Sequence, residues 1–522
     1  MKIGTSKPIE TVDSLSLLAL KVASNVFDIS SSLSHLSIRD QVVRAQMLVR
    51  DLKQAEPGLD RLLIVGAGVA GMAAALTARE LKITEVLVLD IKPEPFSLLR
   101  DVTARHVGPF MYEWPSPFFN DQSYPHHTPA PSFGNASSPL VWKAASPVSA
   151  QALAKALDAH VRERFAEVGV PPPTLCVGMD KWRISEFVTR FARTEGARTV
   201  ARLQKRALPD AASLFYKGST WPDAGTTSGS FVPQYVVLAA GMGTENLQLI
   251  ENDSRFVGKS FWSNDDLLDN VTCKHRVAVF GGGDGALQDV LRSLTGHEHP
   301  LCFIRHLEAK SAVRRALAEV SPQLLSADRQ SRQFSGWTKG HTGFINVDHS
   351  CQKIAAVLAK NRHVVYRVLD GLRKMQRTPG SVDHPEVALF VRESYFDKTY
   401  LLNRFLVHLI EACMATLSRS RRRSSRAAPA VDRWEDIMML RVYRGCKAAA
   451  YATAGARHVV TIEDLATKAQ WTYSADRVVV RYGISKDSIP GGQMIQISAK
   501  VSQQRTTLNR VELPFVAHSA PG

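Results

Sequence analysis

The sequence predicts an α/β protein in which two strand–turn–helix units follow one another along 522 residues. The first observation is an apolar run at 62–65, typical of a strand buried on both faces, followed by a glycine-rich turn and a helical pattern at 72–81. The second observation is a similar arrangement at 277–294. The third is the length of the chain, which suffices for two or three domains with cores of their own.

Composition and charge limit the classes of protein that fit. The chain is 45% hydrophobic and 22% charged, as is usual for globular domains. Its six cysteines are widely spaced, which excludes a disulfide scaffold and a CxxC redox or metal site, and we expect the cytoplasm. No apolar stretch is long enough to span a membrane. The net charge of +16 would attract nucleic acid or another anionic surface, but a basic surface without a dedicated partner is the simpler interpretation.

Residues 1–60 predict a helical N-terminal extension. Apolar residues such as Leu15, Val22 and Val26 recur at helical spacing, and Pro57-Gly58 then interrupts the chain. We expect this extension to pack on the domain that follows it.

The first glycine-rich turn, at residues 66–71, has the spacing of a dinucleotide site. Gly66 permits a tight turn, Gly68 lets a pyrophosphate approach the backbone, and Gly71 lets the helix lie close to the strand. The N-terminus of the helix presents unpaired N–H groups to the phosphates. The next apolar strand ends in Asp90, at about the distance in sequence where an acid binds ribose hydroxyls. The alternative is a purely structural glycine turn.

The segment 236–241 adds a family resemblance. It ends in Gly241 and resembles the strand by which two-dinucleotide flavoproteins complete their FAD domain, with Ala240 in place of the usual Thr. The resemblance implies FAD at the first turn, with Gly241 beside it. It also implies an FAD-binding domain at 61–255, completed by about 452–522.

A second nucleotide-like unit is expected to start within 256–310. Its turn fits GxGxxA through Gly281, Gly283 and Ala286. A predicted strand at 301–304 ends in Arg305, where a cation favours the 2′-phosphate of NADPH over NADH. Asp284 places a negative charge in the same turn, which is unfavourable for a pyrophosphate unless its side chain points away. The alternative is a Rossmann-like unit retained for packing.

Residues 311–451 predict a mostly helical insertion without a recognisable motif. Within it, the basic run 419–426 has no interleaved aromatic residues and is expected to be a solvated loop.

Between the two turns lies a second segment with a family resemblance. Phe256, Gly258 and Asp266 match the FxGxxxHxxxW/D fingerprint, with Trp262 at the position of the His. Residues 61–305 together resemble class B flavoprotein monooxygenases of the flavin-containing and Baeyer–Villiger types. The resemblance implies an FAD-binding Rossmann-like domain with a second, nested Rossmann-like unit and a helical insertion. The implied activity is NAD(P)H-dependent monooxygenation of a small molecule.

Two residues are weak catalytic candidates. Arg105 lies within the segment 92–147, which is rich in Pro, His and aromatic residues and is expected to cover the site, and a cation near a flavin stabilises the reduced, anionic ring. Trp262 stands at the fingerprint's His position, although a packed aromatic side chain in a linker is an equally good interpretation. No metal site is assigned. Two other functions stay open: a flavin amine or amino-acid oxidase or dehydrogenase that does not use NAD(P)H, and a non-catalytic flavin-bound sensor.

Overall fold

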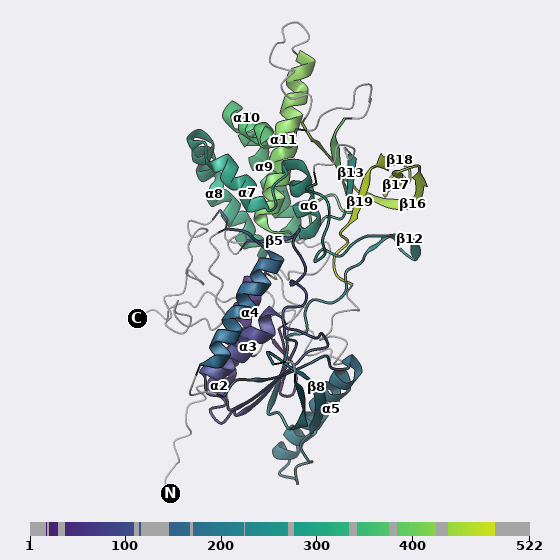
Figure 1. Ribbon diagram of the computed structural model, residues 1–522. Helices are drawn as coiled ribbons and strands as arrows, with labels where there is room; N and C mark the ends of the chain where they lie inside the picture. The colour runs from purple at the N-terminus through teal and green to yellow at the C-terminus, as the bar shows by residue number, and fades with distance from the viewer. Residues whose placement is uncertain are drawn as a thin grey trace.

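The chain forms two units that lie one above the other in Figure 1. The computed structural model describes residues 17, 20–29, 37–108, 114–115, 146–167, 171–223, 225–269, 276–332, 342–374, 384–397, 399–423 and 437–485. The first unit is built on an eight-stranded sheet and the second on a four-stranded sheet. The predicted α/β class, with two Rossmann-like units, is confirmed.

The first sheet has the strand order β1-β2-β10-β3-β4-β7-β8-β9. Its five central strands, from β2 to β7 in that order, run parallel, and β8 and β9 continue one edge antiparallel. The strands are β1 (Lys21–Ala23), β2 (Val26–Asp28), β3 (Arg61–Val65), β4 (Glu85–Leu89), β7 (Thr174–Val177), β8 (Leu214–Thr220), β9 (Thr226–Phe231) and β10 (Tyr235–Leu238).

Helices cover both faces of this sheet because its strands are apolar on both sides. Leu62 and Ile64 of β3 pack in one cluster, whereas Leu63 and Val65 pack in the other. The first cluster contains helices α2 (Ile38–Ala55), α3 (Val69–Glu80) and α4 (Ala150–Ala166), and the second contains α5 (Lys181–Leu203).

The N-terminal extension is only partly helical. Helix α2 agrees with the prediction, but residues 21–28 form the strands β1 and β2. Strand β2 pairs in parallel with β10 near the edge of the first sheet. The apolar residues at 21–28 therefore belong to strands and not to a helix. Residues 1–16, 18–19 and 30–36 lie outside the described residues.

The second sheet is parallel throughout, in the order β15-β14-β13-β19. Its strands are β13 (Arg276–Phe280), β14 (Glu386–Val391), β15 (Met439–Arg444) and β19 (Arg477–Val480). One face packs on helices, and the other on an antiparallel sheet of β16 (Cys446–Ala454), β17 (Arg457–Asp464) and β18 (Gln470–Ala475). The helices are α6 (Asp284–Thr295), α7 (Pro300–Glu308), α8 (Ser311–Arg332), α9 (Thr342–Leu358), α10 (Arg362–Asp370) and α11 (Leu401–Arg423).

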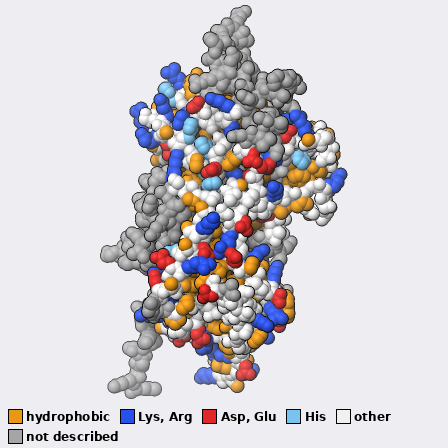
Figure 2. Space-filling view, in the orientation of Figure 1, with side chains coloured by type: hydrophobic (Ala, Val, Ile, Leu, Met, Phe, Trp, Pro, Cys, Tyr) orange, Lys and Arg blue, Asp and Glu red, His pale blue; other side chains and the backbone are white. Residues whose placement is uncertain are grey.

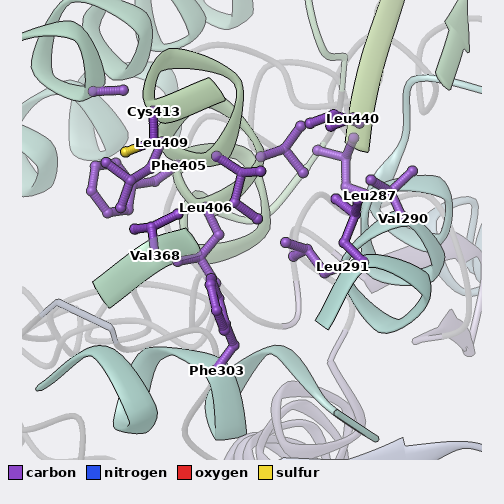
Figure 3. Packing of buried hydrophobic residues seen from close by; sticks show 14 of the residues in the cluster. Leu287, Val290, Leu291, Phe303, Val368, Phe405, Leu406, Leu409, Cys413 and Leu440 are labelled. Carbon is purple, nitrogen blue, oxygen red and sulfur yellow. The ribbon is translucent and has the colours of Figure 1, made fainter. Parts of the chain in front are cut away.

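Helix α11 forms the centre of this helical layer. Figure 3 shows Leu406 and Leu409 of α11 among apolar side chains that include Leu287 and Leu291 of α6 and Phe303 of α7. Among the described residues, α11 is the one helix long and apolar enough to cross a membrane, over Leu401–Arg419. Of that stretch, 67% is buried inside the protein, as expected for a core helix.

The structure divides the chain differently from the predicted domains at two places. The region 311–451 is mostly helical, but it also contains β14, which pairs with β13, and β15, which pairs with β14. The described part of 452–522 does not complete the first unit, since β19 pairs in parallel with β13 of the second. The first sheet is extended by β1 and β2 instead. Residues 486–522 lie outside the described residues.

Charges are mixed on the face seen in Figure 2. Lys and Arg side chains occur over both units, with Asp and Glu among them. The basic run predicted as a loop begins inside helix α11, which continues to Arg423. Residues 424–426 lie outside the described part of the chain.

Candidate functional site

The turn between β3 and α3 contains two glycines that the fold itself requires. Gly66 has a φ of +110°, and a Cβ there would lie 2.3 Å from the carbonyl oxygen of Ala239. A Cβ on Gly71 would lie 1.7 Å from the carbonyl oxygen of Gly66. No side chain fits at either position, so both glycines allow the close contact between strand and helix that the spacing predicts.

Gly68 differs from these two glycines because space lies beside it. Its backbone is extended (φ −73°, ψ −172°), and a Cβ there would meet no atom within 4 Å. Gly68 is also the N-cap of α3, and no side chain caps this helix end. The first N–H groups of α3 therefore have no side-chain acceptor at the point where a phosphate group would fit.

The structure brings Asp90 to the same turn. Strand β4 ends directly before it, and Asp90 Oδ2 accepts a hydrogen bond from the N–H of Ala67 at 2.5 Å. The other oxygen accepts one from the N–H of Lys92 at 2.7 Å. Burial raises the pKa of Asp90, while these backbone hydrogen bonds act in the opposite direction. Its contact with a ribose stays a prediction.

Gly241 lies at the same edge of the sheet, after the neighbouring strand β10. Strand β10 pairs in parallel with β3, with Leu238 opposite Val65. Both strands end at the carboxyl edge of the sheet, which is where ligands bind in open α/β sheets. Gly241 has a φ of +85°, and a Cβ there would meet nothing within 4 Å.

The second unit repeats this turn geometry between β13 and α6. Gly281 has a φ of +137°, and a Cβ there would lie 2.2 Å from the carbonyl oxygen of Arg481, which follows β19. Gly283 is the uncapped N-cap of α6, with nothing within 4 Å of a Cβ. Ala286 is fully buried where the first turn has Gly71. Gly281 and Gly283 thus correspond to Gly66 and Gly68.

The negative charge in the second turn points away from this space. Asp284 Oδ1 accepts hydrogen bonds from the N–H of Tyr400 at 3.2 Å and from Asn403 Nδ2 at 2.7 Å, both at the start of α11. Burial raises the pKa of Asp284 to about 6, although these hydrogen bonds act in the opposite direction. The carboxylate therefore holds α11 against the turn.

Arg305 does not stand at the end of a strand, and this prediction is wrong. Residues 300–308 form helix α7, which starts with Pro300 at its first turn and with His299 as N-cap. Proline is favoured there, so the pair His299-Pro300 was a helix signal that the apolar run at 301–304 obscured. Arg305 donates instead to Ser146 Oγ at 3.1 Å.

Strand β14 lies next to β13 in the sheet, beside the second turn. Arg392 comes directly after β14. The N–H of Gly281 donates to the carbonyl oxygen of Phe390, as the N–H of Gly66 donates to that of Leu89. By this correspondence Val391 occupies the place of Asp90, with the exposed Arg392 next to it. The second unit thus has a valine where the first has an acid, followed directly by an arginine, which sequence reasoning missed because β14 was taken as helical.

Arg105 is not directed into an open site. Its guanidinium is 1% exposed, pairs with Asp289 and with Asp265 Oδ2 at 2.8 Å, and lies 4.4 Å from the ring centre of Phe261. These partners belong to the second unit and to the segment that leads into it.

Trp262 packs at the same junction. Its ring stands edge-on to Phe261 at 5.2 Å, and it lies against the apolar core of the first unit. The packed-aromatic interpretation thus describes its surroundings, and a catalytic role stays a prediction. Of the aromatic segment before α4, residues 109–113 and 116–145 lie outside the described residues.

Comparisons with known proteins agree with the Rossmann-like fold of the first unit. Residues 64–130 match the family described as NAD(P)-binding Rossmann-like domain. No curated protein matches the chain.

The solved structures that match the chain do so at low sequence identity and low TM-score. One is DfoA from Erwinia amylovora, a cadaverine monooxygenase bound to FAD (9% identity, TM-score 0.34, covering 81% of this chain and 77% of that one). Another is L-lysine 6-monooxygenase from Pseudomonas syringae (14% identity, TM-score 0.33, covering 82% and 81%). A third is thioredoxin reductase from Lactococcus lactis (10% identity, TM-score 0.32, covering 86% and 95%).

Proposed function

We propose that the chain is an FAD-dependent oxidoreductase that takes electrons from NADPH and oxygenates a small molecule. The observation that carries the proposal is the repeated turn. Each unit has a strand, a glycine that the fold requires, an uncapped glycine with free space beside it, and a helix N-terminus. Two such turns suit two dinucleotides, since each can bind a pyrophosphate with backbone N–H groups alone.

The residues of the first turn fit FAD. Gly68 leaves room for the pyrophosphate, and Asp90 lies beside the turn, where it could bind a ribose. Gly241 leaves free space at the end of the neighbouring strand. When bound, the flavin supplies the redox chemistry, and the protein's part is to hold and orient it.

The residues of the second turn fit NADPH better than NADH. The side chain of Asp284 is turned towards α11, so the space beside Gly283 has no carboxylate from it. Arg392 follows β14, one residue after the position where an acid would select the free ribose of NADH, and a guanidinium pairs well with a 2′-phosphate. We therefore transfer the proposed nucleotide selectivity from Arg305 to Arg392.

Spectroscopy and turnover separate this function from its alternatives. FAD added to the purified protein should change its visible spectrum and raise its melting temperature, since a ligand that binds only the folded state stabilises it. Steady NADPH oxidation by the FAD-loaded protein is expected. An oxidase would bind FAD, ignore NADPH and be reduced by an amine, and a sensor would bind FAD and react with neither.

The compartment belongs to the proposal as well. The five cysteines in the described residues are free thiols, and all except Cys302 are buried. Free thiols throughout the described part of a chain of this size suit a reducing compartment, so we propose the cytoplasm.

A further inference from the structure

A cluster of buried charges joins the two units. It consists of Arg105 from the first unit, Asp265 from the connecting segment, Asp289 and Arg292 from α6, and Arg481 after β19. We call these five residues the inter-unit ion cluster. Arg292 contacts Asp265 at 2.9 Å and Asp289 at 3.1 Å, and Arg481 contacts Asp289 at 2.8 Å. Both carboxylates are therefore shared between arginines from different parts of the chain.

These charges lie deep inside the protein. Asp289 is 0% exposed, and Arg105 and Arg292 are each 1% exposed. Burial alone would raise the pKa of Asp289, but the charges of Arg105, Arg481 and Arg292 lower it to about 2. A buried pair of this kind tolerates little change, because removing one partner leaves an uncompensated charge.

Hydrogen bonds to the backbone extend the contact around the cluster. Asn264 Oδ1 accepts from the N–H groups of Thr103 and Ala104 at 2.8 and 3.0 Å, and Asn264 Nδ2 donates to the carbonyl of Asp101 at 2.8 Å. Arg292 also donates to the carbonyl of Ala104 at 2.8 Å. The second unit and its connecting segment thus hold residues 101–105 by main chain and by side chain.

This held segment leads back to the first glycine turn. The N–H of Phe96 donates to the carbonyl of Ala67 at 3.1 Å, inside the turn. At the other end, Asp289 and Arg292 lie on α6, whose N-terminus is the second turn. The segment 96–105 therefore connects the two candidate dinucleotide sites directly.

The apolar cores, by contrast, stay mainly within their own units. Two clusters lie in the first unit. The other two lie in the second and include Leu249 and Leu267 from the stretch between β10 and β13, and Trp114, which stacks on Phe405 at 5.2 Å. Among the described residues, the ion cluster and the Asn264 hydrogen bonds thus join the units through directional polar contacts, and such contacts fix an angle better than apolar contacts do.

We infer that Arg105 is a positioning residue that sets the orientation of α6, and thus of the second turn, on the first unit. The inference rests on the proposed function, since the orientation matters for hydride transfer between two bound dinucleotides. In that step a hydride leaves NADPH with two electrons, NADP⁺ forms, and the flavin is reduced. Arg105 touches neither reacting atom, and it acts by holding the two sites at one separation.

The test compares Arg105→Met with a matched control, Arg404→Met. Arg404 is also 1% exposed and pairs with the fully buried Asp348 at 2.8 Å, but both residues lie inside the second unit. The Kd values for FAD and NADPH, and the rate of flavin reduction at saturating NADPH without oxygen, are measured for both variants. Amide hydrogen exchange is followed at 101–106 and in α6.

In Arg105→Met we expect both Kd values within about threefold of wild type. The reduction rate should fall on the order of 100-fold, since a misplacement of about 1 Å costs that much. Exchange should rise at 101–106 and in α6. Arg404→Met should leave the reduction rate and the exchange of 101–106 unchanged.

A milder variant covers the case in which Arg105→Met does not fold. Asn264→Ala removes the hydrogen bonds to residues 101–104 without exposing a buried charge, and it should show the same exchange changes at smaller size. Unchanged exchange at 101–106 and an unchanged reduction rate in either variant would overturn the inference. If the wild type binds no NADPH, the proposed function fails, and the exchange comparison still decides whether the cluster orients the units.

Discussion

At the scale of single residues, the first glycine turn separates positions required by the fold from a position free for a ligand. Gly71→Ala would place a Cβ against the carbonyl of Gly66. Gly68→Asp would place a carboxylate in free space, on an extended backbone that any residue adopts. The sequence motif places all three glycines in one turn but does not show this difference, which depends on what surrounds each one.

We predict that Gly68→Asp impairs ligand binding, whereas Gly71→Ala impairs stability. Gly68→Asp should keep the wild-type melting temperature. It should weaken FAD binding by on the order of 100-fold or more, because a negative group would occupy the space for the pyrophosphate. Gly71→Ala should lower the free energy of unfolding by about 1 to 3 kcal/mol through overpacking. Titration with FAD and chemical denaturation measure the two effects. Normal FAD affinity in a folded Gly68→Asp protein would contradict the assignment.

Asp284 provides a prediction about pH. Its pKa is raised from 3.8 to about 6, so the folded state holds the proton more tightly than the unfolded state. Stability should therefore fall as the pH rises from about 4 to about 6, by on the order of 3 kcal/mol at most. Asp284→Asn keeps an oxygen for Tyr400 and Asn403 and carries no charge. It should melt above the wild type at pH 8, and the difference should shrink towards pH 4. A wild type that is at least as stable as Asp284→Asn at pH 8 would contradict this prediction.

Arg392 and Arg305 offer a direct comparison of two predicted nucleotide contacts. Arg392→Ala should weaken NADPH binding by about 30- to 150-fold, the equivalent of about 2 to 3 kcal/mol, and leave the affinity for NADH nearly unchanged. Arg305→Ala should affect neither nucleotide, since Arg305 lies on α7. Isothermal titration with both nucleotides gives the four affinities. Equal losses for NADPH and NADH in Arg392→Ala would assign Arg392 a structural role.

At the scale of elements, the sequence predicts a strand best when a glycine turn marks its end. Strands β3 and β13 were found in this way. Strand β14 is equally apolar, with all six residues buried, but it lies between the helices α10 and α11 and no turn motif follows it. The strand predicted at 301–304 is a helix, because a short apolar run fits both structures and Pro300 decides between them.

The N-terminal strands belong to the first sheet, and we predict that its stability depends on them. Phe27 of β2 is 4% exposed, and its ring lies 6.2 Å from that of Tyr235 on β10. Phe27→Ala should cost about 3 to 5 kcal/mol, as for other large core side chains. Lys21→Ala, at an exposed position of β1, serves as the control and should cost little. Equal stability of the two variants in chemical denaturation would mean that this edge is dispensable.

At the scale of the whole molecule, the sequence predicts two units but not how they meet. Arg105 and Asp289 are 184 residues apart, and neither position belongs to a motif. A cation within the aromatic segment 92–147 suggested a flavin contact, whereas the fold pairs Arg105 with carboxylates on α6 and on the connecting segment. The order of strands in the second unit was equally hidden, since β19 returns to β13 only after the antiparallel sheet β16–β18.

The central claim is that a dinucleotide on the second turn delivers electrons to FAD on the first. Anaerobic mixing of the FAD-loaded protein with NADPH, followed through the visible absorption of the flavin, tests it most directly. The account predicts bleaching in the wild type, and none in Gly283→Asp, which fills the free space beside the second turn while FAD stays bound. Wild-type protein that binds FAD and keeps its full absorption with excess NADPH would contradict the account, as would Gly283→Asp protein bleached at the wild-type rate.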